Sequence, residues 1–101
     1  MPVTTSQDHT ARVWSAGDWS CLATLTGHTA AVEACVWAPE GSALVTASWD
    51  GTARVWSARD WSCLATLTGH TAAVMCCAWA PNGSALVTMS ADHSARVWSD
   101  I

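Results

Sequence analysis

The sequence predicts an all-β repeat protein, and two observations support that prediction. The first is a period of 42 residues: Trp14, Trp56 and Trp98 are equivalent, and residues 7–48 match residues 49–90 at 34 of 42 positions. The second is the make-up of the unit, whose apolar runs are short, rich in Val, Thr and Trp, and bounded by turn residues. Because no run reaches helix length without a Gly, Pro or Ser-Thr break, helical tandem repeats of similar period are excluded.

Each unit divides into as many as four short strands separated by turns. Three strands are expected in the N-terminal set, four in the central set and three in the last set, with no linker or low-complexity segment between the sets. The expected strands are Val3–Ser6, Ala11–Trp14 and Ser20–Leu25, then Val32–Trp37, Ala43–Ala47, Ala53–Trp56 and Ser62–Leu67, and finally Val74–Trp79, Ala85–Met89 and Ala95–Trp98.

Several motifs recur in the units in one order and spacing. In the central unit they are Gly27-His28, a Trp-Ala-Pro-x-Gly turn at residues 37–41, a Ser-x-Asp-Gly turn at residues 48–51 and the strand-ending Trp56. With these motifs, essentially the whole chain resembles a tandem array of WD40 repeats, although the Trp-Asp dipeptide that names the family is replaced by Trp56-Ser57 and its equivalents.

The resemblance implies a fold made of four-stranded antiparallel β-propeller blades, about two and a half per chain. Residues 1–26 would form a partial blade, residues 27–68 a full blade and residues 69–101 a second partial blade. An array of this size would close only by oligomerisation or as part of a longer chain, because propellers usually need four or more blades.

The resemblance also implies a hydrogen-bonded tetrad of His, Ser or Thr, Asp and Trp within each blade. Ser, His and Asp together also form hydrolase triads, but here the set recurs in each blade, includes a Trp donor and lacks a nucleophile-elbow motif. We therefore expect a structural tetrad and no enzymatic activity. The expected members are His28, Ser48, Asp50 and Trp56 in the central blade, His70, Ser90, Asp92 and Trp98 in the last blade, and Ser6, Asp8 and Trp14 in the first.

Positions at which near-identical repeats differ are the best candidates for function. The resemblance implies that the loops before the first strand and between the second and third strands form one face, which commonly binds partner peptides. Trp49 lies in such a turn, where a Trp is a frequent interface anchor; the alternative is that it packs over the neighbouring blade. The candidate partner-binding face comprises Gln7, Trp49, Ala91, Met89, Glu33 and Met75.

Composition narrows the classes of partner. The chain carries four Lys and Arg residues without a cluster against eight Asp and Glu residues, which argues against nucleic acid and anionic membranes. No apolar run approaches the roughly 20 residues of a membrane span, and we expect neither a membrane span nor a signal peptide. We expect no metal, no cofactor and no small-molecule substrate.

The cysteine count is odd, and no Cys-x-x-Cys spacing is present. We expect buried thiols that act as small hydrophobic side chains in a reducing compartment, hence a cytoplasmic location. The alternative is redox regulation at the adjacent Cys76-Cys77 pair. Two histidines, His9 and His93, stand where Gly51 stands in the central unit, so a positive φ is expected at all three positions.

The strand tally predicts self-assembly. The N-terminal set lacks a first strand and the last set lacks a fourth, so chains could join head to tail and close into a ring. Either both partial blades remain, or one of the overlapping copies, Val3–Trp14 and Val87–Trp98, is displaced. The expected function is a homo-oligomeric WD40-type scaffold or adaptor for a protein or peptide; the alternative is a structural fragment of a larger WD40-repeat regulatory protein.

Overall fold

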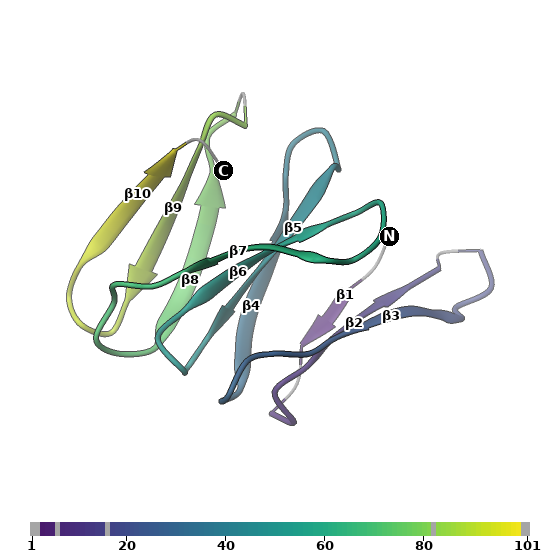
Figure 1. The fold of residues 1–101 in the computed structure, drawn as a ribbon, viewed down its shortest axis with the longest axis horizontal. Helices are drawn as coiled ribbons and strands as arrows, with labels where there is room; N and C mark the ends of the chain where they lie inside the picture. The colour runs from purple at the N-terminus through teal and green to yellow at the C-terminus, as the bar shows by residue number, and fades with distance from the viewer. Residues whose placement is uncertain (1–2, 6, 16, 82, 100–101) are drawn as a thin grey trace.

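Three antiparallel sheets lie side by side in chain order in the computed structural model, which describes residues 3–5, 7–15, 17–81 and 83–99 (Figure 1). The described residues contain strands and turns and no helix, which confirms the predicted all-β class. The strands are β1 (Val3–Thr5), β2 (Ala11–Trp14), β3 (Cys21–Leu25), β4 (Val32–Trp37), β5 (Ala43–Ser48), β6 (Ala53–Ser57), β7 (Cys63–Leu67), β8 (Val74–Trp79), β9 (Ala85–Ser90) and β10 (Ala95–Ser99).

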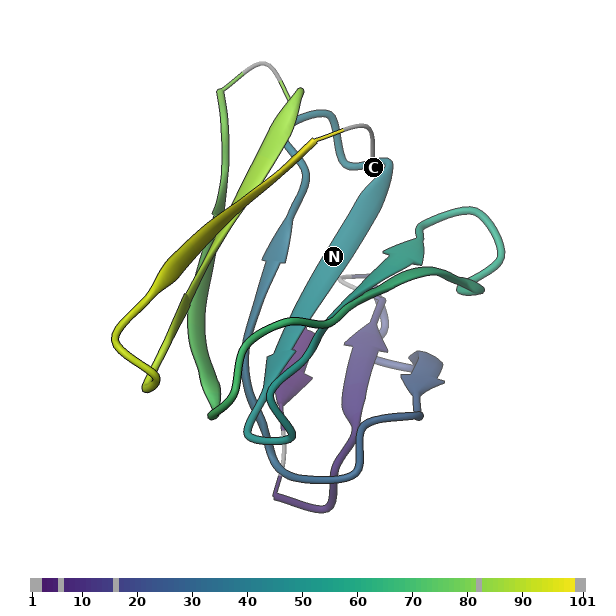
Figure 2. The same cartoon turned by 60° about the vertical axis from the view of Figure 1, so that its left-hand side comes forward.

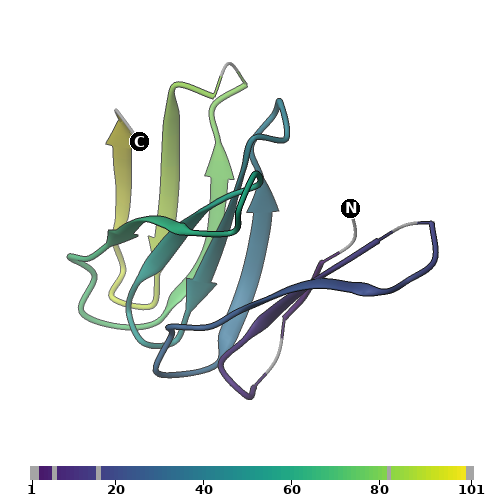
Figure 3. The same ribbon diagram turned by 45° about the vertical axis from the view of Figure 1, so that its right-hand side comes forward.

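Each sheet is a simple meander in which strands that follow one another in sequence are paired. The strand orders are β1-β2-β3, β4-β5-β6-β7 and β8-β9-β10, so the first sheet lacks the equivalent of β4 and the last lacks the equivalent of β7. Figures 2 and 3 show that the sheets are twisted and splayed, with the four-stranded sheet between the other two. We refer to the sheets as the first, central and last blade.

Two apolar cores hold the blades together, and strand alternation explains how one strand serves both. Leu44 faces the first blade, where it meets Val13, whereas its neighbour Val45 faces the last blade and meets Leu86. Every residue of β5 is consequently buried. The central blade is therefore sandwiched, whereas each outer blade has only one covered face.

The tight turn between the second and third strands of each blade has a left-handed residue, as predicted. The φ angle is 76° at His9, 86° at Gly51 and 72° at His93. In the central blade, Gly51 packs against the backbone of the last blade, since an added Cβ would lie 3.4 Å from the carbonyl oxygens of His70 and Ala72. The two histidines occupy the same backbone position and are exposed.

Candidate functional site

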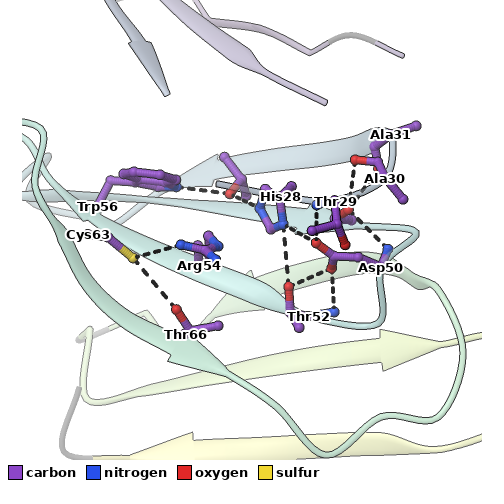
Figure 4. Close-up of polar contacts among 12 residues, drawn as sticks. His28, Thr29, Ala30, Ala31, Asp50, Thr52, Arg54, Trp56, Cys63 and Thr66 are labelled. Atoms are coloured by element: carbon purple, nitrogen blue, oxygen red, sulfur yellow. Dashed lines mark hydrogen bonds and ion pairs between the residues drawn. The ribbon is translucent and has the colours of Figure 1, made fainter. Parts of the chain in front are cut away.

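A chain of side-chain hydrogen bonds crosses the central blade from its turn to its core (Figure 4). Asp50 Oδ2 lies 2.9 Å from His28 Nδ1, and His28 Nε2 lies 2.7 Å from Thr46 Oγ1. The indole N–H of Trp56 then donates to Thr46 Oγ1 at 2.9 Å. The chain ties the loop before β4 to strands β5 and β6.

The hydroxyl in this chain belongs to Thr46, which corrects the sequence assignment to Ser48. Ser48 instead donates to the backbone oxygen of Ala31 at 2.9 Å and accepts from the backbone N–H of Asp50 at 3.1 Å. The reason is the strand register. Leu44 is opposite Trp56, so Thr46 is the diagonal neighbour on the same face, while Ser48 lies two residues further along β5.

The hydrogen-bond pattern specifies the neutral state of His28. Nδ1–H donates to the Asp50 carboxylate, so Nε2 is free to accept from the Thr46 hydroxyl, whose oxygen in turn accepts from Trp56. A proton on Nε2 would leave the Thr46 hydroxyl proton without this acceptor. Burial acts in the same direction and lowers the pKa of His28, against the opposing effect of the Asp50 carboxylate.

Asp50 is the acceptor on which the turn converges. The carboxylate accepts from His28, from the backbone N–H of Thr29 at 3.0 Å and from the backbone N–H of Thr52 at 2.9 Å. Burial raises the pKa of Asp50, but hydrogen bonds from Thr52, His28 and Thr29 outweigh it and lower the pKa to about 2. Asp50 is therefore ionised at neutral pH, as an acceptor of this kind must be.

The last blade repeats this arrangement and the first blade retains part of it. His70 lies 3.0 Å from Asp92 and 2.8 Å from Thr88, and Trp98 donates to Thr88 at 2.9 Å. Thr88 thus takes the place assigned to Ser90, whose hydroxyl donates to the backbone of Ala72. In the first blade, Trp14 donates to Thr4 at 3.1 Å and Asp8 caps its own turn at Thr10; Ser6 lies outside the described residues.

Sequence analysis missed the close approach of Arg54 to the glycine that precedes His28. Gly27 has a φ of 136°, and a Cβ added there would lie 2.7 Å from Nη1 of Arg54. The same contact recurs between Gly69 and Arg96. The backbone angle favours glycine before each tetrad histidine, and any side chain there would also displace the guanidinium. The recurrence of Gly directly before His in both repeats was the sequence signal that could have indicated this contact.

Trp49 lies in the turn between β5 and β6 and is 56% exposed. Its indole N–H donates to Glu33 Oε2 at 2.9 Å, which ties the ring to β4 of its own blade. Gln7 and Ala91 lie exposed in the corresponding turns of the flanking blades, and Met75 is exposed near the start of β8.

Met89 is the exception in this predicted face. It pairs with Ala95 and Cys76 within the last sheet, at the position where Ala47 of the central blade faces its neighbour. Met89 therefore belongs to the uncovered sheet face of the last blade, beside Val97. The repeats do differ here, with Ala47 in one and Met89 in the other, but this position lies on the sheet face and not on the turn face.

The cysteines differ from the expectation of buried thiols. Cys21 and Cys63 begin the outermost strands of their blades and are exposed, as is Cys76. Cys35 is half-buried and Cys77 is buried, and burial raises the pKa of the Cys77 thiol to about 12. Strand patterning does not show which edge of a blade meets solvent, which explains the error.

The described part of the chain holds no group of three or more His, Cys, Asp or Glu side chains that could bind a metal ion. In the same residues there is no helix with the length and hydropathy needed to cross a membrane.

These features define a repeat protein of stacked antiparallel blades, in which an internal polar chain joins the strands of the central and last blades. The WD domain, G-beta repeat family matches residues 19–57 and 61–99, which is more than half of the chain. The protein belongs to the WD40-repeat family. Such repeats are protein-interaction scaffolds and are generally non-catalytic. A comparison with curated proteins gives no match.

Proposed function

We propose that the chain is a non-catalytic scaffold that assembles head to tail with further copies and presents its turn face to a protein or peptide. One observation above all supports assembly. Val97 on β10 is 72% exposed, whereas the equivalent Val55 on β6 is 2% exposed because the last blade covers it. The apolar blade face that is buried in the central blade is therefore exposed to solvent in the last blade.

The stack itself shows which surface covers such a face. In the central blade, Leu44, Trp37 and Trp56 cover the face of the preceding blade that contains Val13. The uncovered face of the last blade repeats that covered face, since Val97 is the equivalent of Val13. A second copy whose central blade is not occupied by its own first blade can therefore cover it through a heterologous contact, and such contacts close into rings.

The assembly is tested by light scattering on the purified chain together with a matched pair of variants. Val97→Arg places a charge in the proposed interface, whereas Leu64→Arg places one at another exposed site, on β7 and away from that face. We expect a defined oligomer for the unchanged chain and for Leu64→Arg, and a monomer for Val97→Arg. A monomeric unchanged chain would overturn the assembly and favour a structural fragment of a larger WD40-repeat protein.

For the partner-binding face, the geometry favours a peptide with an apolar side chain and a hydrogen-bond donor. The exposed ring of Trp49 offers apolar area, and the Glu33 carboxylate that holds it offers an acceptor. Peptides selected from a displayed library against the chain should bind Trp49→Ala at least about tenfold more weakly, and should bind Leu64→Ala, a change at an exposed residue of β7 outside this face, about as well. Equal binding to both variants would contradict this assignment.

We also place the chain in the cytoplasm. Cys21, Cys63 and Cys76 are exposed, and an exposed thiol persists most readily in a reducing compartment. Fractionation of cells that express the chain tests this; recovery with secreted proteins would contradict it.

A further inference from the structure

The outer edge of β10 is unpaired among the described residues, although its sequence matches a strand that is paired elsewhere. β10 ends its sheet, whereas the equivalent β6 is followed by β7. The five residues of β10, Ala-Arg-Val-Trp-Ser, are identical to those of β6. β7 reads Cys-Leu-Ala-Thr-Leu, and so does β3 in the first blade.

We propose that β3 of a second copy leaves its own blade and pairs with β10, completing the last blade as its fourth strand. The proposal rests on the self-assembly proposed above and specifies how the copies join. The register follows from β6 and β7, where Val55 is opposite Ala65 and Arg54 is opposite Thr66. At the junction, Val97 would be opposite Ala23 of the second copy, and Arg96 opposite its Thr24.

A pair of tryptophans supports this arrangement independently. In the central blade, Trp61 precedes β7 and meets Trp37 of β4 edge to face, with ring centroids 6.1 Å apart. Their equivalents are Trp79 on β8 and Trp19 before β3, and in the described structure neither has a ring partner. Trp19 is 63% exposed.

Trp79 and Trp19 correspond to the two members of the Trp37–Trp61 contact, but within one chain they lie on different blades. If β3 of a second copy adds to β10, it brings Trp19 of that copy to the place beside Trp79 that Trp61 occupies beside Trp37. If the first blade were instead stacked whole on the last blade, Trp19 and Trp79 would remain on different blades. The tryptophans therefore favour transfer of the strand over stacking of complete blades.

Transfer replaces the contacts that it breaks in the first blade, which include those of buried Ala11 and Val13 on β2. Leu25 is the one fully buried residue of β3, and the strand leaves the Ala-Arg-Val-Trp run of β2 for the identical run of β10. In exchange, the strands that meet the central blade become β8, β9 and β10, with six, six and five residues, instead of β1 and β2, with three and four. The composite blade has four strands, as the central blade does.

The resulting chain contributes two complete blades to a ring. One is its own central blade, and the other joins its last three strands to β3 of the next copy. The loop after β3 leads directly into the central blade of that copy, so the face containing Val97 is covered by Trp37, Leu44 and Trp56, as the first blade is now. Three or four copies would give about six or eight blades, within the usual range of propellers.

Cross-linking between two singly substituted chains tests the register. A chain with Val97→Cys is mixed with a chain with Ala23→Cys and oxidised mildly, and the linked peptides are identified by mass spectrometry, which separates them from links between native cysteines. Arg96→Cys with Thr24→Cys is the second pair, and both of these residues are exposed. Successive pairs of an antiparallel ladder alternate in spacing, so one of the two pairs has the closer approach that suits a disulfide.

The matched control is Leu22→Cys with Val97→Cys. Leu22 adjoins Ala23, but the register shift between Val13 and Trp14 leaves it without a residue opposite. We expect the yield of linked peptide at one in-register pair to exceed the yield of the control pair at least about fivefold. The reason is that only that in-register pair has Cβ atoms within roughly 5 Å of each other. An oligomer whose in-register links do not exceed the control overturns strand transfer and leaves self-assembly standing. A chain that light scattering finds monomeric overturns both.

Discussion

At the scale of single residues, the side chain that organises each blade is a threonine that accepts and donates at once. Thr46 lies at the centre of the polar chain, between His28 Nε2 and the indole N–H of Trp56, and is fully buried. Because this hydroxyl both donates and accepts, it gives a hydrogen-bond partner to each of the two buried polar atoms beside it. Removal of this one oxygen affects two partners.

Thr46→Val is the sharpest test of that role, because it keeps the shape of the side chain and removes only the hydroxyl. We expect a loss of about 1–3 kcal/mol in the free energy of unfolding, since His28 Nε2 and the indole N–H of Trp56 both lose their hydrogen-bond partner. Denaturant unfolding measures the loss, with Thr46→Ser as the control that keeps the oxygen. Equal stability of the valine and serine variants would contradict the assignment.

The same polar chain predicts that acid destabilises the fold in two steps. Burial lowers the pKa of His28 below its ordinary 6.5, so as the pH falls through that value the unfolded chain takes up a proton that folded His28 resists. Asp50 has a pKa of about 2 in the fold against an ordinary 3.8, so its ionised form favours folding, and that contribution is lost as the pH falls from about 4 to about 2.

We therefore expect the melting temperature to fall between about pH 7 and 5, and again below about pH 4. The Ser94 hydroxyl and further hydrogen bonds hold the pKa of Asp92 well below its usual range, so the last blade adds to the second step. Asp50→Asn should reduce the second step, and a melting temperature that is flat from pH 7 to 5 would contradict the role given to His28.

At the scale of elements, strands were more predictable than contacts. Turn residues and short β-branched runs located all ten strands to within a residue at most ends, because both signals are local. The choice between Thr46 and Ser48 was not local. Both lie on one face of β5, and which hydroxyl reaches Trp56 depends on how β5 and β6 are offset.

The exposure of strand edges also required the assembled blades. Cys63 and Leu67 begin and end the same strand, but the first is exposed and the second is buried, because only the end of β7 packs into the core between blades. Alternation along a strand does not report such a gradient. Sequence analysis could therefore identify each blade but not the surface that each blade leaves open.

The two equivalent tryptophans before β3 and β7 provide a matched prediction at this scale. Trp61→Ala removes a ring that meets Trp37 within one chain, so we expect a lower melting temperature for that chain. Trp19→Ala removes a ring that is 63% exposed in the single chain, so the fold should be little affected while the oligomer dissociates at a higher protein concentration.

Melting curves and light scattering over a dilution series separate these effects. The two variants remove the same side chain from the same repeat position, so the difference between them isolates the contact between copies. If Trp19→Ala lowered melting as much as Trp61→Ala and left the oligomer unchanged, Trp19 would have no part in the junction.

At the scale of the whole molecule, the outer blades have nearly the same sequence and strand pairing as the central blade. The central blade shows how a complete blade is paired, covered and fastened, and the outer blades show the same surfaces with one strand absent. Near-identity of the repeats makes each open surface complementary to a strand that the chain already contains. Association then requires no interface beyond those that hold the single chain together.

Deletion of residues 1–15 tests this most directly, because β1 and β2 compete with the last blade for the same place in the ring. Strand transfer predicts that the shortened chain, which keeps β3, still forms the oligomer, and that its melting temperature is unchanged or raised because β3 no longer has a partner within its own chain. Light scattering and thermal melting measure the two results.

The control is deletion of residues 1–26, which removes β3 as well. This longer deletion leaves the central blade intact but removes the strand that completes a neighbour, so we expect a monomer. The pair of deletions thus differs by one strand and by the Trp19 that precedes it. If removal of residues 1–15 alone dissociated the oligomer, the first blade would have to act as an intact unit at the junction, and β3 would not be the element that joins the copies.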